Sequence, residues 1–186
     1  MHGLSKTIQG GQYVRFFQLG YIVGGLLVIV LVPSIIYIIT SLFDTVYRLE
    51  IIHNSIIKWI IIIILFVIGL IYGIWSLIIQ NTIGEGGPVE IGNIEISPKT
   101  KNLVVSGPYK NTRNPMLFGA FSIYLAFALF INSITSVVLV CAILVFMLTV
   151  VVKMEEKRLL KDFGNQYEEY RKKVSIFIPW VQRKIK

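Results

Sequence analysis

Long stretches without a charged residue divide the chain into apolar and polar parts. Two of these stretches cover residues 16–43 and 59–84. About 20 apolar residues cross the hydrocarbon core of a bilayer as a helix, so each stretch predicts one membrane-spanning helix. Pro33 lies inside the first and predicts a kink, because membrane helices tolerate proline without breaking. We interpret the second predicted helix as scaffold.

The third uncharged stretch, residues 114–152, is too long for one span. As a single helix it would be about 58 Å long, nearly twice the thickness of the hydrocarbon core. We therefore expect the chain to fold back at Asn132-Ser133. The two resulting spans, residues 114–131 and 134–152, would form a tight helical hairpin.

The polar parts of the chain have different characters. Residues 85–113 are rich in Gly and Pro and predict a loop, in which Ile91 and Ile94 belong to a short extended pattern. Residues 153–186 form an amphipathic, basic tail that we expect to lie on the membrane surface or to cover the open face of the protein. Gly164 predicts an interruption of its helix.

Composition and charge indicate that these elements belong to a membrane protein, and they predict its orientation. Hydrophobic residues make up 55% of the chain, and the mean hydropathy is +0.73. These values predict an all-α integral membrane protein, which we treat as one domain over residues 1–186. All Lys and Arg residues except Arg48 and Lys58 fall on one side of the predicted spans. The positive-inside rule places that side, with both termini, the loop and the tail, in the cytoplasm.

The excess of basic residues is explained by the orientation of the membrane spans, so we expect no nucleic-acid partner. Cys141 is the one cysteine, and His2 and His53 are far apart in the sequence. These residues do not have the spacing of a metal site, so we predict no metal.

The start of the third predicted span is a candidate anion site. Asn114 is a residue type favoured at a helix N-cap, and Pro115 is of the type favoured at the first helical position. The free N–H groups of that helix end, with Arg113 beside them, would attract a carboxylate or a phosphate. Alternatively, Arg113 only extends its charge to the membrane interface. The spacing does not decide between these interpretations.

Glu155 and Glu156 lie at the cytoplasmic end of the fourth predicted span. They are either a solvated charge cluster or a clamp for a cationic or hydroxyl-bearing ligand. The two spans are neighbours in the hairpin, so we expect Arg113 and Glu155 on one rim. Opposite charges on one rim suit a zwitterion such as S-adenosylmethionine.

Three motifs together resemble a known family. GPYKNTRNPM, the glutamate pair and FGNQYEEYRKKVSIFIP, in this order, resemble the isoprenylcysteine carboxyl methyltransferases, with phospholipid N-methyltransferases as more distant relatives. The resemblance covers residues 84–179. It implies an integral membrane enzyme that transfers a methyl group from S-adenosylmethionine to a lipid-borne or small hydrophobic acceptor.

The resemblance also implies which residues bind the cofactor, and the charge argument adds Arg113 and Glu156. The predicted cofactor-binding residues are Lys101, Asn102, Leu103, Val104, Tyr109, Arg113, Asn114, Pro115, Met116, Leu117, Glu155, Glu156, Tyr167 and Tyr170. Tyr167, Tyr170 and Arg171 would belong to the tail that covers the site. No catalytic residue is assigned.

Two departures from the family concern the acceptor. Many members have His where this chain has Asn114, and Asn cannot act as an acid or base near neutral pH. The carboxyl methyltransferases also carry a substrate-binding arginine where this chain has Val151, unless Lys153 replaces it. The acceptor therefore stays open among a carboxylate, a thiol, an amine and a lipid headgroup.

Two other functions are compatible with the pattern. One is a nicotinamide-dependent membrane reductase of the sterol-reductase type, whose C-terminal architecture is similar. The other is a small non-enzymatic membrane scaffold. An ion-coupled transporter is disfavoured, because the predicted spans contain no charged residue.

Overall fold

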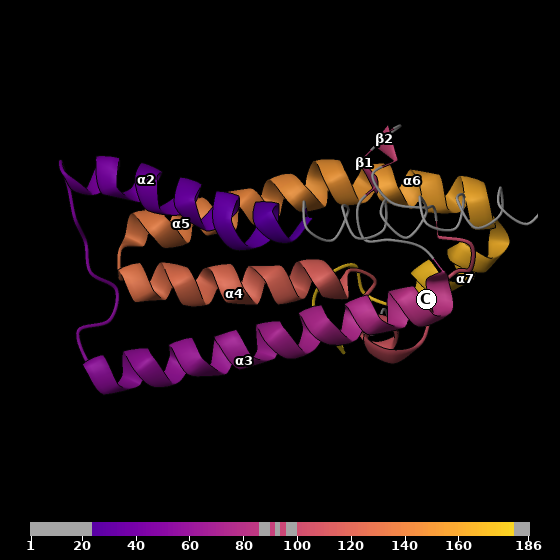
Figure 1. Cartoon of the computed structure of the whole chain (residues 1–186), viewed down its shortest axis with the longest axis horizontal. Helices are drawn as coiled ribbons and strands as arrows, with labels where there is room; N and C mark the ends of the chain where they lie inside the picture. Colours follow the sequence, from indigo (N-terminus) through magenta and orange to yellow (C-terminus); the bar gives the residue numbers. More distant parts are fainter. Residues whose placement is uncertain (1–23, 86–89, 92–93, 96–99, 181–186) are drawn as a thin grey trace, which may run out of the picture.

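The computed structural model describes residues 24–85, 90–91, 94–95 and 100–180. In this part of the chain, the long helices run along one axis (Figure 1). The α-helices are α2 (Val32–Asp44), α3 (Ser55–Ile79), α4 (Pro115–Ile131), α5 (Ile134–Phe146), α6 (Val152–Phe163) and α7 (Asn165–Lys173). Two short strands, β1 (Glu90–Ile91) and β2 (Ile94–Glu95), pair antiparallel within the predicted Gly-rich loop.

Short helical turns of other types extend these elements. The π-helical turns are η1 (Leu27–Leu31), η2 (Gln80–Gly84) and η4 (Met147–Val151), and η3 (Gly107–Lys110) is a 3-10 turn. η2 continues α3, and η4 joins α5 to α6, so both belong to longer continuous helices. Such π-turns often occur near functional sites.

Three helices of the described residues are long and apolar enough to cross a membrane: Gly24–Asp44, Ser55–Gly84 and Ile134–Phe163. α4 is a shorter apolar helix of 17 residues. At 1.5 Å per residue it extends about 26 Å, slightly less than a hydrocarbon core. The protein is thus an all-α integral membrane protein, as the composition predicts.

The first membrane helix continues through Pro33 without a break. The π-turn η1 lies directly before α2, and Pro33 stands at the start of α2. A proline lacks the N–H group that an α-helix would use there, and the wider turn accommodates this loss. Residues 16–23, which the sequence assigns to this helix, lie outside the described residues.

The last membrane helix is longer than the sequence predicts. It runs to Phe163, whereas the end of the uncharged stretch predicts an end at residue 152. Charged residues mark where a helix leaves the hydrocarbon core, and they do not end the helix itself. The predicted interruption at Gly164 is present, since Gly164 has a φ of 50° and separates α6 from α7.

The helices form an open arrangement in which each packs mainly on the next. α3 packs along α4, α4 packs on α5, and α5 packs on α2. Two glycines allow the backbones of α3 and α4 to approach closely: a Cβ added to Gly119 would lie 2.9 Å from the carbonyl oxygen of Gly69. Small residues serve the same purpose wherever membrane helices pack tightly.

The end of the molecule that carries the α4–α5 turn is closed by polar contacts. Asn132 adopts the left-handed conformation that reverses the chain, as predicted for this turn. Its side chain accepts a hydrogen bond from the Ile52 amide and donates one to the Ile52 carbonyl oxygen, each at 3.1 Å. The Ser133 hydroxyl donates to the Asp44 carboxylate at 2.7 Å. These bonds tie the hairpin to the connector between α2 and α3.

At the opposite end, the end of α3, the start of α4, the end of α6 and α7 come together (Figure 1). The central loop and the tail therefore lie at the same end of the molecule. This is expected, because two predicted spans separate them along the chain.

Candidate functional site

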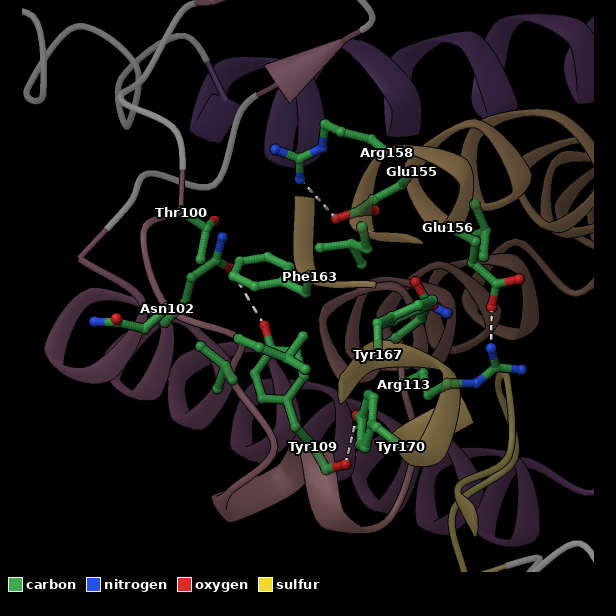
Figure 2. A pocket seen from close by; sticks show the side chains of 16 residues that line it. Thr100, Asn102, Tyr109, Arg113, Glu155, Glu156, Arg158, Phe163, Tyr167 and Tyr170 are labelled. Atoms are coloured by element: carbon green, nitrogen blue, oxygen red, sulfur yellow. Dashed lines mark hydrogen bonds and ion pairs between the residues drawn. The ribbon is translucent and has the colours of Figure 1, made fainter. Parts of the chain in front are cut away.

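A cavity opens where the central loop and the tail meet. Its enclosed volume is about 70 Å³, and its mouth is open to solvent. Figure 2 shows that its walls come from the loop, from α6 and from α7. The lining residues are Gln80, Thr100, Asn102, Leu103, Val104, Tyr109, Arg113, Asn114, Val152, Glu155, Glu156, Arg158, Leu159, Phe163, Tyr167 and Tyr170.

The loop wall is held against the end of α3 by main-chain bonds. The amides of Lys101 and Asn102 donate to the Gly84 carbonyl oxygen at 2.8 Å and 3.4 Å. A Cβ at Gly84 would lie 3.0 Å from a methyl carbon of Thr100 and 3.1 Å from one of Val104. Glycine at this position therefore permits the close approach that brings the loop residues to the cavity.

Two tyrosines connect the loop to α3 and to α7. The Tyr109 hydroxyl donates to Gln80 at 3.2 Å, and the Tyr170 hydroxyl donates to the Tyr109 carbonyl oxygen at 2.7 Å. Burial, and to a lesser extent the Glu155 charge, raises the pKa of Tyr109. Burial also raises the pKa of Tyr170. Both hydroxyls consequently stay protonated near neutral pH and act as donors.

Arg113 and Glu156 form a buried ion pair on one wall (Figure 2). The Arg113 Nη1 donates to the Glu156 Oε1, and the two side chains are 3% and 16% exposed. Tyr167 lies beside them, and burial, followed by the Glu156 charge, raises its pKa to about 12. The predicted anion site at Arg113 is therefore occupied by an internal carboxylate, and Arg113 does not extend to the membrane interface.

The Glu155 side chain is more exposed than that of Glu156, while burial of its carboxyl group in the site, and then the Glu156 charge, raises its pKa. Its side chain is 50% exposed, and its Oε1 lies 3.7 Å from the Arg158 Nη2. Such a separation gives only a weak attraction at an exposed site. Glu155 is thus the cavity carboxylate that a positively charged ligand can approach. Arg113 and Glu155 line the same cavity, as expected for one rim, but Arg113 pairs with Glu156 and is not left open to a ligand.

Asn114 precedes α4, and Pro115 occupies its first turn, as predicted. Asn114 stands at the N-cap, but its side chain makes no capping hydrogen bond, and its Nδ2 donates to the Ile176 carbonyl oxygen at 2.8 Å. The prediction of a side-chain cap is therefore wrong. Asn114 instead joins the start of α4 to the C-terminal tail.

The tail is held over this helix start by further contacts. The Arg113 amide donates to the Ser175 carbonyl oxygen at 2.9 Å, and the Trp180 amide donates to the Asn111 carbonyl oxygen at 3.1 Å. The Phe177 ring is buried and packs edge-on against aromatic rings of α4. The tail is consequently a fixed part of the site's architecture.

A comparison with protein-family models identifies the family. A model described as phospholipid methyltransferase matches residues 57–166, from α3 to the first turn of α7. The chain belongs to the phospholipid methyltransferase family. This family includes membrane methyltransferases like the isoprenylcysteine carboxyl methyltransferases, so the resemblance seen in the motifs is confirmed. No curated protein and no solved structure matches the chain.

The family match covers most of the cavity. The predicted cofactor-binding residues that line it are Asn102, Leu103, Val104, Tyr109, Arg113, Asn114, Glu155, Glu156, Tyr167 and Tyr170. The predicted residues that are not among its lining are Lys101, Pro115, Met116 and Leu117. Lys101 points to an exposed ion pair with Glu85 at 3.2 Å, and the other three lie in the first turn of α4.

Several lining residues escaped the sequence-based prediction. These are Gln80, Thr100, Val152, Arg158, Leu159 and Phe163. Gln80 had a usable signal, because it is one of two adjacent amide residues at the end of an otherwise apolar stretch. The interpretation of residues 59–84 as scaffold alone is therefore incomplete. Leu159 and Phe163 lie one turn apart, a spacing that places both on one helix face.

Proposed function

We propose that this membrane methyltransferase uses S-adenosylmethionine to methylate a lipophilic acceptor at the cytoplasmic face of the membrane. The observation that carries the proposal is a half-exposed carboxylate, Glu155, in the wall of a cavity at the mouth of the membrane helices. The whole chain would then act as one membrane domain, with the tail covering the cofactor.

The lining residues fit such a cofactor in charge and polarity. Glu155 would attract the ammonium or sulfonium group of the cofactor. Arg158, on the same wall, would attract its carboxylate. The hydroxyl oxygens of Tyr109 and Tyr170, whose protons are donated within the protein, could accept hydrogen bonds from polar groups of the cofactor.

The bound cofactor supplies a methyl group that is already activated for displacement. The protein then has to bind, orient and enclose the reactants, and such positioning can contribute about 7–11 kcal/mol to lowering the barrier. An amine acceptor also has to lose a proton. Glu155 is better suited to accept it than Glu156, whose carboxylate is engaged by Arg113.

The acceptor would enter from the bilayer between α3 and the helix that contains α6. Gln80 from the end of α3 and Val152 from α6 both line the cavity, so it extends between these two helices. α3 packs mainly on α4, and no extended packing joins α3 to α6 among the described residues. A lipid-borne group could thus reach the cavity without crossing the tail.

The cytoplasmic orientation rests on the distribution of basic residues. Apart from Arg48 and Lys58, all of them precede α2, lie in the central loop or follow the uncharged stretch of the last span. A reporter fused to the C-terminus tests this directly. Activity of a reporter that functions only outside the cytoplasm would contradict the orientation.

Binding and transfer are tested with the purified full-length protein in detergent. Isothermal titration with S-adenosylmethionine and with S-adenosylhomocysteine should give saturable heat, and NADPH should give none. Methyl-labelled S-adenosylmethionine incubated with a membrane lipid extract should yield label in the organic phase. Absence of binding of either adenosyl compound would refute the proposal, and binding of NADPH in their place would favour the reductase.

A further inference from the structure

A row of lysines runs along α6 on the side away from the cavity. Lys153, Lys157 and Lys161 are spaced by four residues and are all exposed. Residues Leu159 and Phe163 of the same helix line the cavity. At 100° per residue, the lysines lie about half a turn around the helix axis from these two residues. We call these three residues the lysine row.

The helix that carries the lysine row begins with a lipid-facing surface. Phe146 and Val150 precede the row on the same continuous helix and are 55% and 40% exposed. Figure 1 shows α5 and α6 following one another along one axis. The change from exposed apolar side chains to exposed lysines along this helix marks the level where lipid tails give way to headgroups.

The charge of the lysine row is not balanced within the described structure. The ion pairs recorded for α6 join Glu156 to Arg113 and Glu155 to Arg158, and none involves the lysine row. Both glutamates line the cavity. The outer face of α6 therefore presents three positive charges with no acidic partner among the residues that the structure describes.

We propose that the lysine row binds the headgroups of anionic phospholipids. A phosphodiester without a compensating ammonium group matches three lysines at headgroup level, and each lysine contributes about fivefold to the affinity. The row would thereby fix α6, whose other face forms the cavity wall, at a set depth in the membrane. This inference depends on the membrane location of the helix and is independent of the methyl-transfer reaction.

The test uses native mass spectrometry of the full-length protein in detergent, titrated with phosphatidylglycerol or with phosphatidylcholine of the same acyl chains. Wild-type protein should bind phosphatidylglycerol preferentially. The variant that removes the row is Lys153→Gln, Lys157→Gln and Lys161→Gln, and the preference should fall by about fivefold for each lysine removed. A matched control removes equal charge from other exposed positions: Lys110→Gln, Lys172→Gln and Lys173→Gln.

Three results would overturn the inference. The first is equal binding of the two lipids by the wild-type protein. The second is an equal loss of preference in the control variant, which would mean that general positive charge is responsible. The third is a loss in a variant with arginine at all three positions, which keeps the charge. If the glutamine variant does not fold, a salt series on the wild-type protein decides, since the preference should weaken as salt rises.

Discussion

Replacing Glu156 by glutamine removes the negative charge beside Arg113 and keeps the shape of the side chain. Arg113 stays protonated under all ordinary conditions, so the variant leaves a buried guanidinium without its counter-charge. The Arg113 side chain is 3% exposed, and its Nε has no hydrogen-bond partner among the described residues. The guanidinium therefore has little alternative solvation available.

The expected loss follows from this burial. Removing one partner of a buried ion pair destabilises a protein by about 3–5 kcal/mol. Glutamine still offers an oxygen as hydrogen-bond acceptor, so we expect the lower limit, about 3 kcal/mol. Replacing both partners by apolar residues, Arg113→Met with Glu156→Leu, should bring stability back to within about 1 kcal/mol of wild type, because no unpaired charge remains.

The assay is equilibrium unfolding in mixed detergent and sodium dodecyl sulfate micelles, followed by circular dichroism. Glu168→Gln is the matched control, since Glu168 pairs with Lys172 at 3.7 Å and the two side chains are 44% and 62% exposed. This control should lose less than about 0.5 kcal/mol. Similar losses for Glu156→Gln and Glu168→Gln, or no recovery in the double variant, would refute the reasoning.

Three further changes probe other parts of the molecule. Glu155→Gln should weaken S-adenosylmethionine binding about tenfold by titration calorimetry, because it removes a charge-assisted contact. Tyr167→Phe should reduce the fall of stability between pH 9 and pH 11 by about 1 kcal/mol, because the pKa of Tyr167 is raised to about 12 and the unfolded state alone ionises in that window. Gly119→Ala should cost about 2 kcal/mol in the unfolding assay, since its Cβ would lie 2.8 Å from the Gly73 amide nitrogen.

Each of these three predictions has a result that would contradict it. For Glu155, an unchanged affinity would remove its proposed role, and an equal loss of affinity for 5′-methylthioadenosine, which lacks the charged groups, would indicate a general distortion. For Tyr167, a pH dependence identical to wild type would show that its hydroxyl does not stay protonated in the folded protein. For the helix contact, the control is Gly73→Ala, whose Cβ meets no atom within 4 Å. Equal losses in the two glycine variants would contradict close packing at Gly119.

The sequence predicts the membrane helices well because their signal is local. The absence of charge over 20 or more residues is itself the physical requirement for crossing a bilayer. The turn at Asn132-Ser133 follows from the length of one uncharged stretch, and the break at Gly164 follows from the residue type. The sequence does not predict that the last span continues as one helix from residue 152 to Phe163, because loss of hydrophobicity and loss of helix are separate events along the chain.

The pairing within the site is not a local property. Glu155 and Glu156 are adjacent in sequence and 100° apart around a helix, so only the packing of α6 decides which of them reaches Arg113. By residue type, the Asn114 side chain favours capping the helix. In the structure, its amide group instead donates a hydrogen bond to the Ile176 carbonyl oxygen of the tail. Both outcomes depend on a chain segment more than 40 residues away.

The sequence predicts the close contact between α3 and α4 only in part. Gly69 and Gly73 form a G-x-x-x-G pattern, which often marks tight packing between membrane helices. The pattern shows that α3 has a face for a neighbour. It does not show that the neighbour is Gly119 of the same chain, a partner that only the assembled structure provides.

The anchoring of the tail has a consequence for sequence variation. Ser175 and Ile176 offer their carbonyl oxygens, and Trp180 offers its amide, so the bonds to the helix start use the main chain of the tail. Main-chain groups are the same for nearly all residue types. Substitutions at Ser175 or Ile176 leave these three bonds available, whereas one inserted residue shifts all of them out of register. For these three bonds, the length of the segment therefore matters more than the residue types at Ser175 and Ile176.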